Sequence, residues 1–164
     1  DLFKGQITTL YSDSYHIEKT VTKADLLIGA VLIPGARAPR LVSEQMVASM
    51  QAGSVIVDVA VDQGGSIETI DRITTHQNPI YLKHGVIHYA VSNMPGAVAR
   101  TSTIALTNVT VPYGLQIANY GYQQAVFKNP ALAKGINVMK GMVTYNKVAE
   151  AHQLPYVPLE KAIS

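Results

Sequence analysis

The sequence predicts an α/β domain built on a partial doubly wound, Rossmann-like, mostly parallel sheet of about four strands, followed by long C-terminal helices. Short apolar segments of strand length alternate with helical segments over the first hundred residues, which is typical of parallel α/β folds. Residues 55–61 form a run rich in β-branched residues, as in strands that are covered on both faces. From residue 101 onwards, apolar residues recur at helical spacing.

Four segments are predicted strands: residues 6–11, 24–32, 54–61 and 81–91. Helices are predicted at residues 12–23, 43–50 and 145–153, and prolines and glycines mark residues 33–40 and 92–96 as loops. A long helix is expected from residue 101, kinked or broken at Pro112 and stopped at Asn129 and Pro130. A short turn is expected at residues 131–134.

Composition narrows the class of protein. The chain has 164 residues, enough for one domain, and its 48% hydrophobic and 15% charged residues describe a globular protein. The basic residues are scattered and the net charge is +2, so no nucleic-acid partner is expected. No apolar run reaches the roughly 20 residues of a membrane span. The chain has no cysteines, which fits a reducing, cytoplasmic location.

The histidines do not predict a metal site. His84 and His88 are four residues apart, but Gly85 and the strand-like sequence between them argue against a shared helical face, and no cysteine can complete a set. The five histidines are His16, His76, His84, His88 and His152.

The strongest candidate for a functional side chain is Asp62. It follows the third predicted strand and precedes Gly64 and Gly65, which allow the backbone to come close to a ligand. In open parallel sheets ligands bind beyond the carboxyl ends of the strands, where Asp62 would lie. The alternative is an acid that only caps a turn. Asp58, inside the strand, is interpreted as a hydrogen-bonded structural acid.

Three arginines and three tyrosines have competing interpretations. The arginines could bind an anionic group or could simply be solvated; they are Arg37, Arg40 and Arg100. The tyrosines of the long helix are more typical of packing or subunit contact; they are Tyr113, Tyr120 and Tyr122.

Four segments, in this order and spacing, resemble bacterial alanine dehydrogenase: residues 30–39 (AVLIPGARAP), 57–65 (VDVAVDQGG), 92–96 (SNMPG) and 101–108 (TSTIALTN). The resemblance covers nearly the whole chain. It implies NAD as cofactor and reversible oxidative deamination of L-alanine to pyruvate and ammonium. It also implies a homo-oligomer, a hexamer for the full enzyme.

The resemblance assigns roles to individual residues. Asp62 corresponds to the active-site aspartate beside the nicotinamide and the reacting carbon. Ser12 corresponds to a cofactor-contacting serine, and the residues at the ends of the second, third and fourth predicted strands and just beyond them would line the cofactor. The implied cofactor-binding set is Ser12, Val31, Leu32, Val59, Ala60, Val61, Asp62, Val91, Ser92, Asn93 and Met94.

The resemblance also implies what these residues do not supply. In the family, the phosphate-binding loop, the catalytic histidine and the groups that bind the substrate carboxylate precede the matched region. The chain is therefore expected to be a C-terminal fragment, inactive alone. Residues 1–100 would be the second half of the NAD-binding domain, and residues 101–164 the connecting helix and a segment that packs on the substrate domain.

The same correspondence poses a question about the sheet. Residues 6–11 and 24–32 would be strands 3 and 4 of the doubly wound order, which are not neighbours in that order. The hypothesis is that these strands pair directly or that a second copy fills the gap, since a free edge invites association.

Two alternatives remain. One is the soluble NAD-binding domain of proton-translocating transhydrogenase, against which the sequence from Asp62 to Gly65 favours the dehydrogenase. The other is a non-catalytic binding or assembly module. Titration with NADH distinguishes this module from the dehydrogenase and the transhydrogenase domain, both of which would bind the cofactor.

Overall fold

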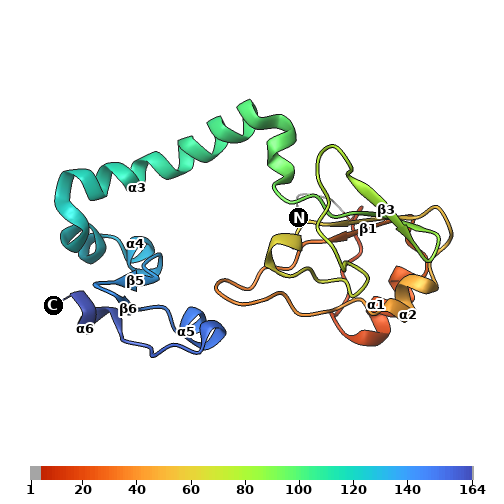
Figure 1. Cartoon of the computed structure of the whole chain (residues 1–164), viewed down its shortest axis with the longest axis horizontal. Coiled ribbons are helices and arrows are strands. Elements are labelled where there is room, and N and C mark those ends of the chain that lie inside the picture. Colours follow the sequence, from red (N-terminus) through yellow and green to blue (C-terminus); the bar gives the residue numbers. More distant parts are fainter. Residues whose placement is uncertain (1–4, 164) are drawn as a thin grey trace. The chain divides into compact units, whose positions relative to one another are not determined.

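The computed structural model describes residues 5–163, which form two compact units. The first unit consists of the residues up to Leu32 together with Arg37–Met94. The second consists of Ile33–Ala36 and the residues from Pro95 onwards. Figure 1 labels their helices and strands, and each unit is described by itself.

The first unit is built on a four-stranded sheet in the order β1-β2-β4-β3. Three strands run parallel to one another and β3 runs antiparallel to β4, which confirms the predicted mostly parallel sheet. The strands are β1 (Leu26–Gly29), β2 (Val55–Asp58), β3 (Ile80–Lys83) and β4 (Val86–Tyr89).

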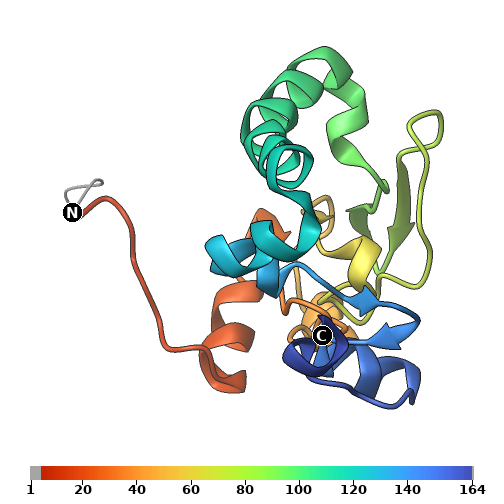
Figure 2. The ribbon, with the colours of Figure 1, turned by 90° about the vertical axis from the view of Figure 1, so that its left-hand side faces the viewer.

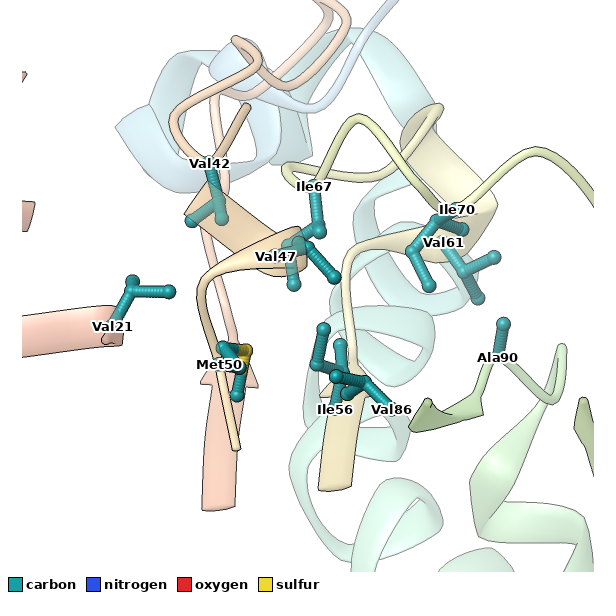
Figure 3. Packing of buried hydrophobic residues seen from close by; sticks show 10 residues of the cluster. All are labelled: Val21, Val42, Val47, Met50, Ile56, Val61, Ile67, Ile70, Val86 and Ala90. Carbon is teal, nitrogen blue, oxygen red and sulfur yellow. The ribbon is translucent and has the colours of Figure 1, made fainter. Parts of the chain in front are cut away.

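Helices α1 (Ser14–Val21) and α2 (Glu44–Ala48) lie next to each other beside this sheet (Figure 1). Figure 3 shows the side chains of the core that they share with the strands and with the loop after β2. Burial alternates along β2, where Ile56 is fully buried and Val55 and Val57 are half-buried. The expectation that this strand is covered on both faces is therefore wrong for the described residues of the first unit. The core consists of Val21, Val42, Val47, Met50, Ile56, Val61, Ile67, Ile70, Val86 and Ala90.

Residues 6–11 do not form the predicted strand. Figure 2 shows the segment as an extended ribbon that leads into α1. The side chains of Ile7, Leu10 and Tyr11 are each more than half exposed, and among the described residues β1 pairs with β2 alone. Direct pairing of this segment with β1 is therefore wrong. The alternative, a second copy at the free edge of β1, stays a prediction.

The fourth predicted strand is a hairpin of two strands, β3 and β4. The two residues between them, His84 and Gly85, both have left-handed backbones, with φ of 54° and 75°. Two-residue hairpin loops favour this conformation because its twist matches the twist of the strands. The sequence does not separate the two strands clearly, because a histidine replaces the usual asparagine of such a turn.

The second unit is mainly helical, and its longest helix is α3 (Ala99–Lys128). The expectation of a break at Pro112 is wrong: Pro112 lies inside the helix, and the break is at Gly121, whose φ of 71° and ψ of 158° are not helical. Residues 131–134, predicted as a turn, belong to a helix that Asn129 caps. The further elements are α4 (Pro130–Lys134), β5 (Val138–Met139), β6 (Met142–Val143), α5 (Asn146–His152) and α6 (Leu159–Ile163). Over residues 5–163, none of the helices has the length and apolar character needed to cross a bilayer.

Candidate functional site

The candidate site lies at the edge of the sheet where β1, β2 and β4 end. These three strands are parallel, so the residues that follow them meet at one edge. The backbone N–H of Val59 donates to the carbonyl of Gly29 at 2.7 Å, which joins the end of β2 to the end of β1. Asp62 follows in the short 3-10 helix η1 (Val61–Gln63).

The loop that carries Asp62 is organised by Asp58, the last residue of β2. Asp58 is fully buried, and its carboxylate accepts hydrogen bonds from the N–H groups of Ala60 and Ser66, both at 2.8 Å. This confirms the interpretation of Asp58 as a hydrogen-bonded structural acid. Gly64 closes η1 in the left-handed conformation, with φ of 93°. The side chain of Asp62 is left exposed.

Asp62 meets a residue from the neighbouring strand. The hydroxyl of Ser92, just beyond β4, donates a hydrogen bond to Oδ1 of Asp62 at 2.5 Å. The structure thus brings together two side chains that the sequence assigned to one site. Val91, beside Ser92, is buried in the unit at 1% exposure.

The backbone after Ser92 turns sharply. Asn93 has a left-handed φ of 54°, and its carbonyl lies 3.2 Å from Nε2 of His76. Met94 then begins the 3-10 helix η2 (Met94–Val98). His76 had no predicted role, and its separation from Asn93 by seventeen residues gave no sequence signal of this contact.

Ser12 and Val31 belong to a second group within the first unit. Both line a hollow of about 380 Å³ between α1, β1 and the segments around Val42 and Ile67. Leu32, the next residue after Val31, is 64% exposed.

The remaining residues of the predicted cofactor set differ in exposure. The side chain of Val59 is 54% exposed, whereas Ala60 and Val61 are buried in the core. Ala60 and Val61 can therefore meet a ligand only through their backbones. Their carbonyls accept the N–H groups of Gln63 and Gly64, at 2.9 and 3.1 Å, and so shape the turn at Asp62.

Other polar groups near the sheet have structural partners. Arg40 donates through Nη1 to the carbonyl of Ile67, so this arginine helps to hold the loop, and its binding of an anion stays a prediction. Lys83 lies between Glu44 and Asp71 at 3.4 and 3.3 Å. Hydrogen bonds from His84 and Lys83 lower the pKa of Glu44. Within the described part of the chain, no three His, Cys, Asp or Glu residues are grouped so as to hold a metal ion.

A profile of the family described as "Alanine dehydrogenase/PNT, C-terminal domain" matches residues 1–146. The chain belongs to this family. The alanine dehydrogenase of Methanococcus maripaludis is 71% identical over 164 residues, which are all of this chain and 44% of that protein. That of Bacillus subtilis is 63% identical over 163 residues, 99% of this chain and 43% of that protein.

Solved structures agree with this family. An L-alanine dehydrogenase superposes with a TM-score of 0.77 at 51% identity, over 93% of this chain and 42% of the other. A transhydrogenase from Sinorhizobium meliloti superposes with a TM-score of 0.50 at 34% identity, over 56% of this chain and 25% of the other. The chain spans less than half the length of these family members.

Proposed function

We propose that this chain takes part in the NAD-dependent oxidative deamination of L-alanine to pyruvate and ammonium, with Asp62 as an active-site residue. The observation that carries the proposal is the hydrogen bond between Asp62 and Ser92 at the carboxyl edge of a parallel sheet. That edge is where open α/β sheets bind their ligands. The high identity to alanine dehydrogenases over the whole chain supports the choice of L-alanine as the substrate.

The residues at this edge fit a nicotinamide cofactor, which would accept the hydride from the alanine Cα. Val59 and the turn at Asp62 supply one wall, and Ser92, Asn93 and Met94 supply the opposite wall. Ser12, Val31 and Leu32 would contact the rest of NAD. The carboxylate of Asp62 is exposed and can meet a ligand there.

Asp62 has a chemical role in this proposal. When hydride leaves the alanine Cα, positive charge develops on the substrate nitrogen as it becomes an iminium group. A fixed carboxylate beside that nitrogen stabilises the charge, and it acts strongly when it does not have to reorient. The hydroxyl of Ser92 fixes Oδ1 of Asp62 and leaves Oδ2 for the substrate side.

A hybrid enzyme tests the proposal. The 164 residues would replace the matched segment of the Methanococcus maripaludis alanine dehydrogenase, to which they are 71% identical. We expect alanine-dependent formation of NADH, and a loss of about a hundredfold or more in Asp62→Asn, because fixed transition-state contacts are worth that much. Asp25→Asn, an exposed acid before β1 at the other end of the strands, is the matched control and should keep full activity.

Two results would count against the proposal. An inactive hybrid that folds and assembles would contradict the alanine dehydrogenase activity, and an active Asp62→Asn hybrid would remove Asp62 from it. The 164-residue chain assayed alone is expected to be inactive, because the residues that the resemblance assigns to acid–base chemistry have no counterpart in it.

A transhydrogenase role is the second candidate, supported by the superposition with that protein over 56% of the chain. It predicts hydride transfer from NADH to an NADP analogue without alanine. The higher identity and coverage of the alanine dehydrogenase favour the first candidate. If the chain fails to bind NADH in a fluorescence titration at millimolar cofactor, a binding or assembly role is left for it in isolation.

We also propose that the protein works in the cytoplasm as a homo-oligomer, a hexamer by family resemblance. Apolar side chains that are at least 43% exposed run along α3 and support the proposal that this helix is covered in the assembled enzyme. These include Ile104, Leu106, Val109, Leu115 and Ile117. The molar mass of the hybrid in solution, measured by light scattering, checks the oligomeric state.

A further inference from the structure

Asp58 is buried beneath the loop that carries Asp62, and the proposed function assigns it no part in the reaction. We propose that Asp58 is a positioning residue, whose carboxylate sets the loop so that Asp62 meets Ser92 and the substrate. This inference rests on the proposed dehydrogenase function.

The carboxylate of Asp58 bonds to two points of the loop. Oδ1 accepts the N–H of Ala60 and Oδ2 accepts the N–H of Ser66, both at 2.8 Å. These two donors lie on either side of Asp62, two residues before it and four after it. One side chain therefore holds both ends of the loop.

The backbone of the loop between Ala60 and Ser66 has little conformational freedom. The N–H groups of Gln63 and Gly65 both donate to the carbonyl of Ala60, at 2.9 and 3.0 Å. Because Asp58 also binds the N–H of Ala60, the same residue anchors the carboxylate and the turn. The position of the Asp62 backbone thus follows from the position of the Asp58 carboxylate.

Two glycines, Gly29 and Gly65, leave the space that the carboxylate of Asp58 occupies. A Cβ on Gly65 would lie 2.9 Å from Oδ2 of Asp58, and a Cβ on Gly29 would lie 3.1 Å from Oδ1 and 2.6 Å from Oγ of Ser66. Side chains at either position would push the carboxylate or the loop aside. Gly65 therefore leaves room for the carboxylate of Asp58, in addition to any ligand that approaches the loop.

Both oxygens of the Asp58 carboxylate are needed as acceptors. Asparagine has the shape of aspartate but offers one acceptor oxygen and one NH₂ group. In Asp58→Asn, one of the two backbone N–H groups would face another donor and would lose its partner. That change releases one end of the loop with little change in volume.

A double-mutant cycle in the hybrid enzyme tests whether Asp58 acts through Asp62. We expect Asp58→Asn to lower kcat about tenfold or more, as for the loss of a hydrogen bond to a charged group. In an Asp62→Asn background the same change should cost less than about twofold, because its effect passes through a residue already removed. Equal losses in both backgrounds would overturn the proposal. Ile56→Val, buried in the same strand, is the control for a general loss of packing.

Amide hydrogen exchange on the 164-residue chain gives a second readout that needs no activity. Asp58→Asn should speed exchange of the amides of Ala60, Ser66 and the residues between them by about tenfold or more, relative to the strands. Ile56→Val should not single out this loop. Unchanged protection in Asp58→Asn would overturn the proposal even if the hybrid is active. An inactive wild-type hybrid would count against the proposed function alone, and hydrogen exchange would then decide the role of Asp58.

Discussion

Ser92 and Asp62 are thirty residues apart in the chain, yet the hydroxyl of Ser92 donates to Oδ1 of Asp62. The contact joins the segments that follow β2 and β4, which are neighbouring parallel strands. The ends of these strands bring the two segments together, and the loop held by Asp58 then sets the position of Asp62. The hydrogen bond fixes the orientation of an exposed carboxylate that would otherwise rotate freely.

The Ser92 hydroxyl should therefore matter for activity. In the hybrid enzyme, Ser92→Ala is expected to lower kcat/KM about tenfold, because hydrogen bonds to charged groups contribute roughly 1.5–3 kcal/mol. Ser92→Thr keeps the hydroxyl and is the matched control, with activity close to that of the parent. Steady-state kinetics with L-alanine and NAD measure both. If Ser92→Ala were as active as the parent, the contact would have no role in orienting Asp62.

The two adjacent glycines of the loop should respond differently to a methyl group. Both have left-handed backbones, with φ of 93° at Gly64 and 72° at Gly65. A Cβ on Gly64 meets open space, so Gly64→Ala should cost only backbone strain, about 1–3 kcal/mol. A Cβ on Gly65 also meets the Asp58 carboxylate, which should add about 1–3 kcal/mol from overcrowding.

Chemical denaturation of the 164-residue chain measures the free energies of unfolding of both variants. Gly65→Ala should be the less stable by a clear margin. Equal losses would mean that the carboxylate of Asp58 moves aside without cost, and would weaken its assignment as the anchor of the loop.

The strand from residue 55 and the turn after it could be predicted from sequence, because β-branched residues and paired glycines act locally. The course of residues 6–11 could not, since a strand needs a partner edge and β1 pairs with β2 alone in the described structure. The role of Asp58 in holding both ends of the loop could not be predicted from the sequence either. Its partner Ser66 is eight residues away, and only the fold shows that the loop closes on it.

The strands β5 and β6 also pair antiparallel as a hairpin, and the sequence pattern missed this hairpin and that of β3 and β4 for a common reason. His84-Gly85 and Lys140-Gly141 each place two residues with positive φ between short strands. A residue followed by glycine between two apolar segments is a signal of such a turn, but it is much weaker than Asn-Gly. The hairpin of β3 and β4 matters for the site, because it fixes where β4 begins and hence where Ser92 lies.

A buried polar group holds this hairpin to the loop after β2. The ring of His88 is fully buried and stacks on Tyr81, and its Nε2 lies 2.8 Å from the hydroxyl of Thr69. Thr69→Val would leave this nitrogen buried without its partner, which typically costs about 1–3 kcal/mol. Thr69→Ser keeps the hydroxyl and should cost less. Equal losses of stability in the two variants, measured by denaturation, would show that the methyl group of Thr69 matters as much as its hydroxyl, and would contradict the role assigned to the hydroxyl.

His88 should also make stability depend on pH. Burial lowers the pKa of His88 below its ordinary value of 6.5, and the nearby positive charges of Lys83 and His84 act in the same direction, whereas Asp71 and the bond to the Val86 carbonyl oppose them. The neutral ring fits its contacts, since Nδ1 lies 2.9 Å from that carbonyl and donates to it, which leaves Nε2 to accept from Thr69.

The sign of the pH effect follows from the lowered pKa. Above pH 6.5 the ring is neutral in both the folded and the unfolded chain, so its full contribution to stability is present. As the pH falls below 6.5, the unfolded chain takes up a proton that the folded chain does not, and the free energy of unfolding decreases until the pH reaches the pKa of the folded state. Asp13, Glu44 and Asp71 have pKa values below their ordinary 3.8–4.5, so their losses begin only at lower pH.

Denaturation of the 164-residue chain at pH 7.5, 6.5 and 5.5, compared between the parent and His88→Gln, therefore measures the contribution of His88. We expect the free energy of unfolding to fall between pH 6.5 and 5.5, and His88→Gln to be less stable overall but to lose much of this slope. His152→Gln, an exposed position in α5, is the matched control and should keep the slope. A slope that persists unchanged in His88→Gln would mean that another group takes up the proton, and that the buried ring does not resist charging in the folded chain.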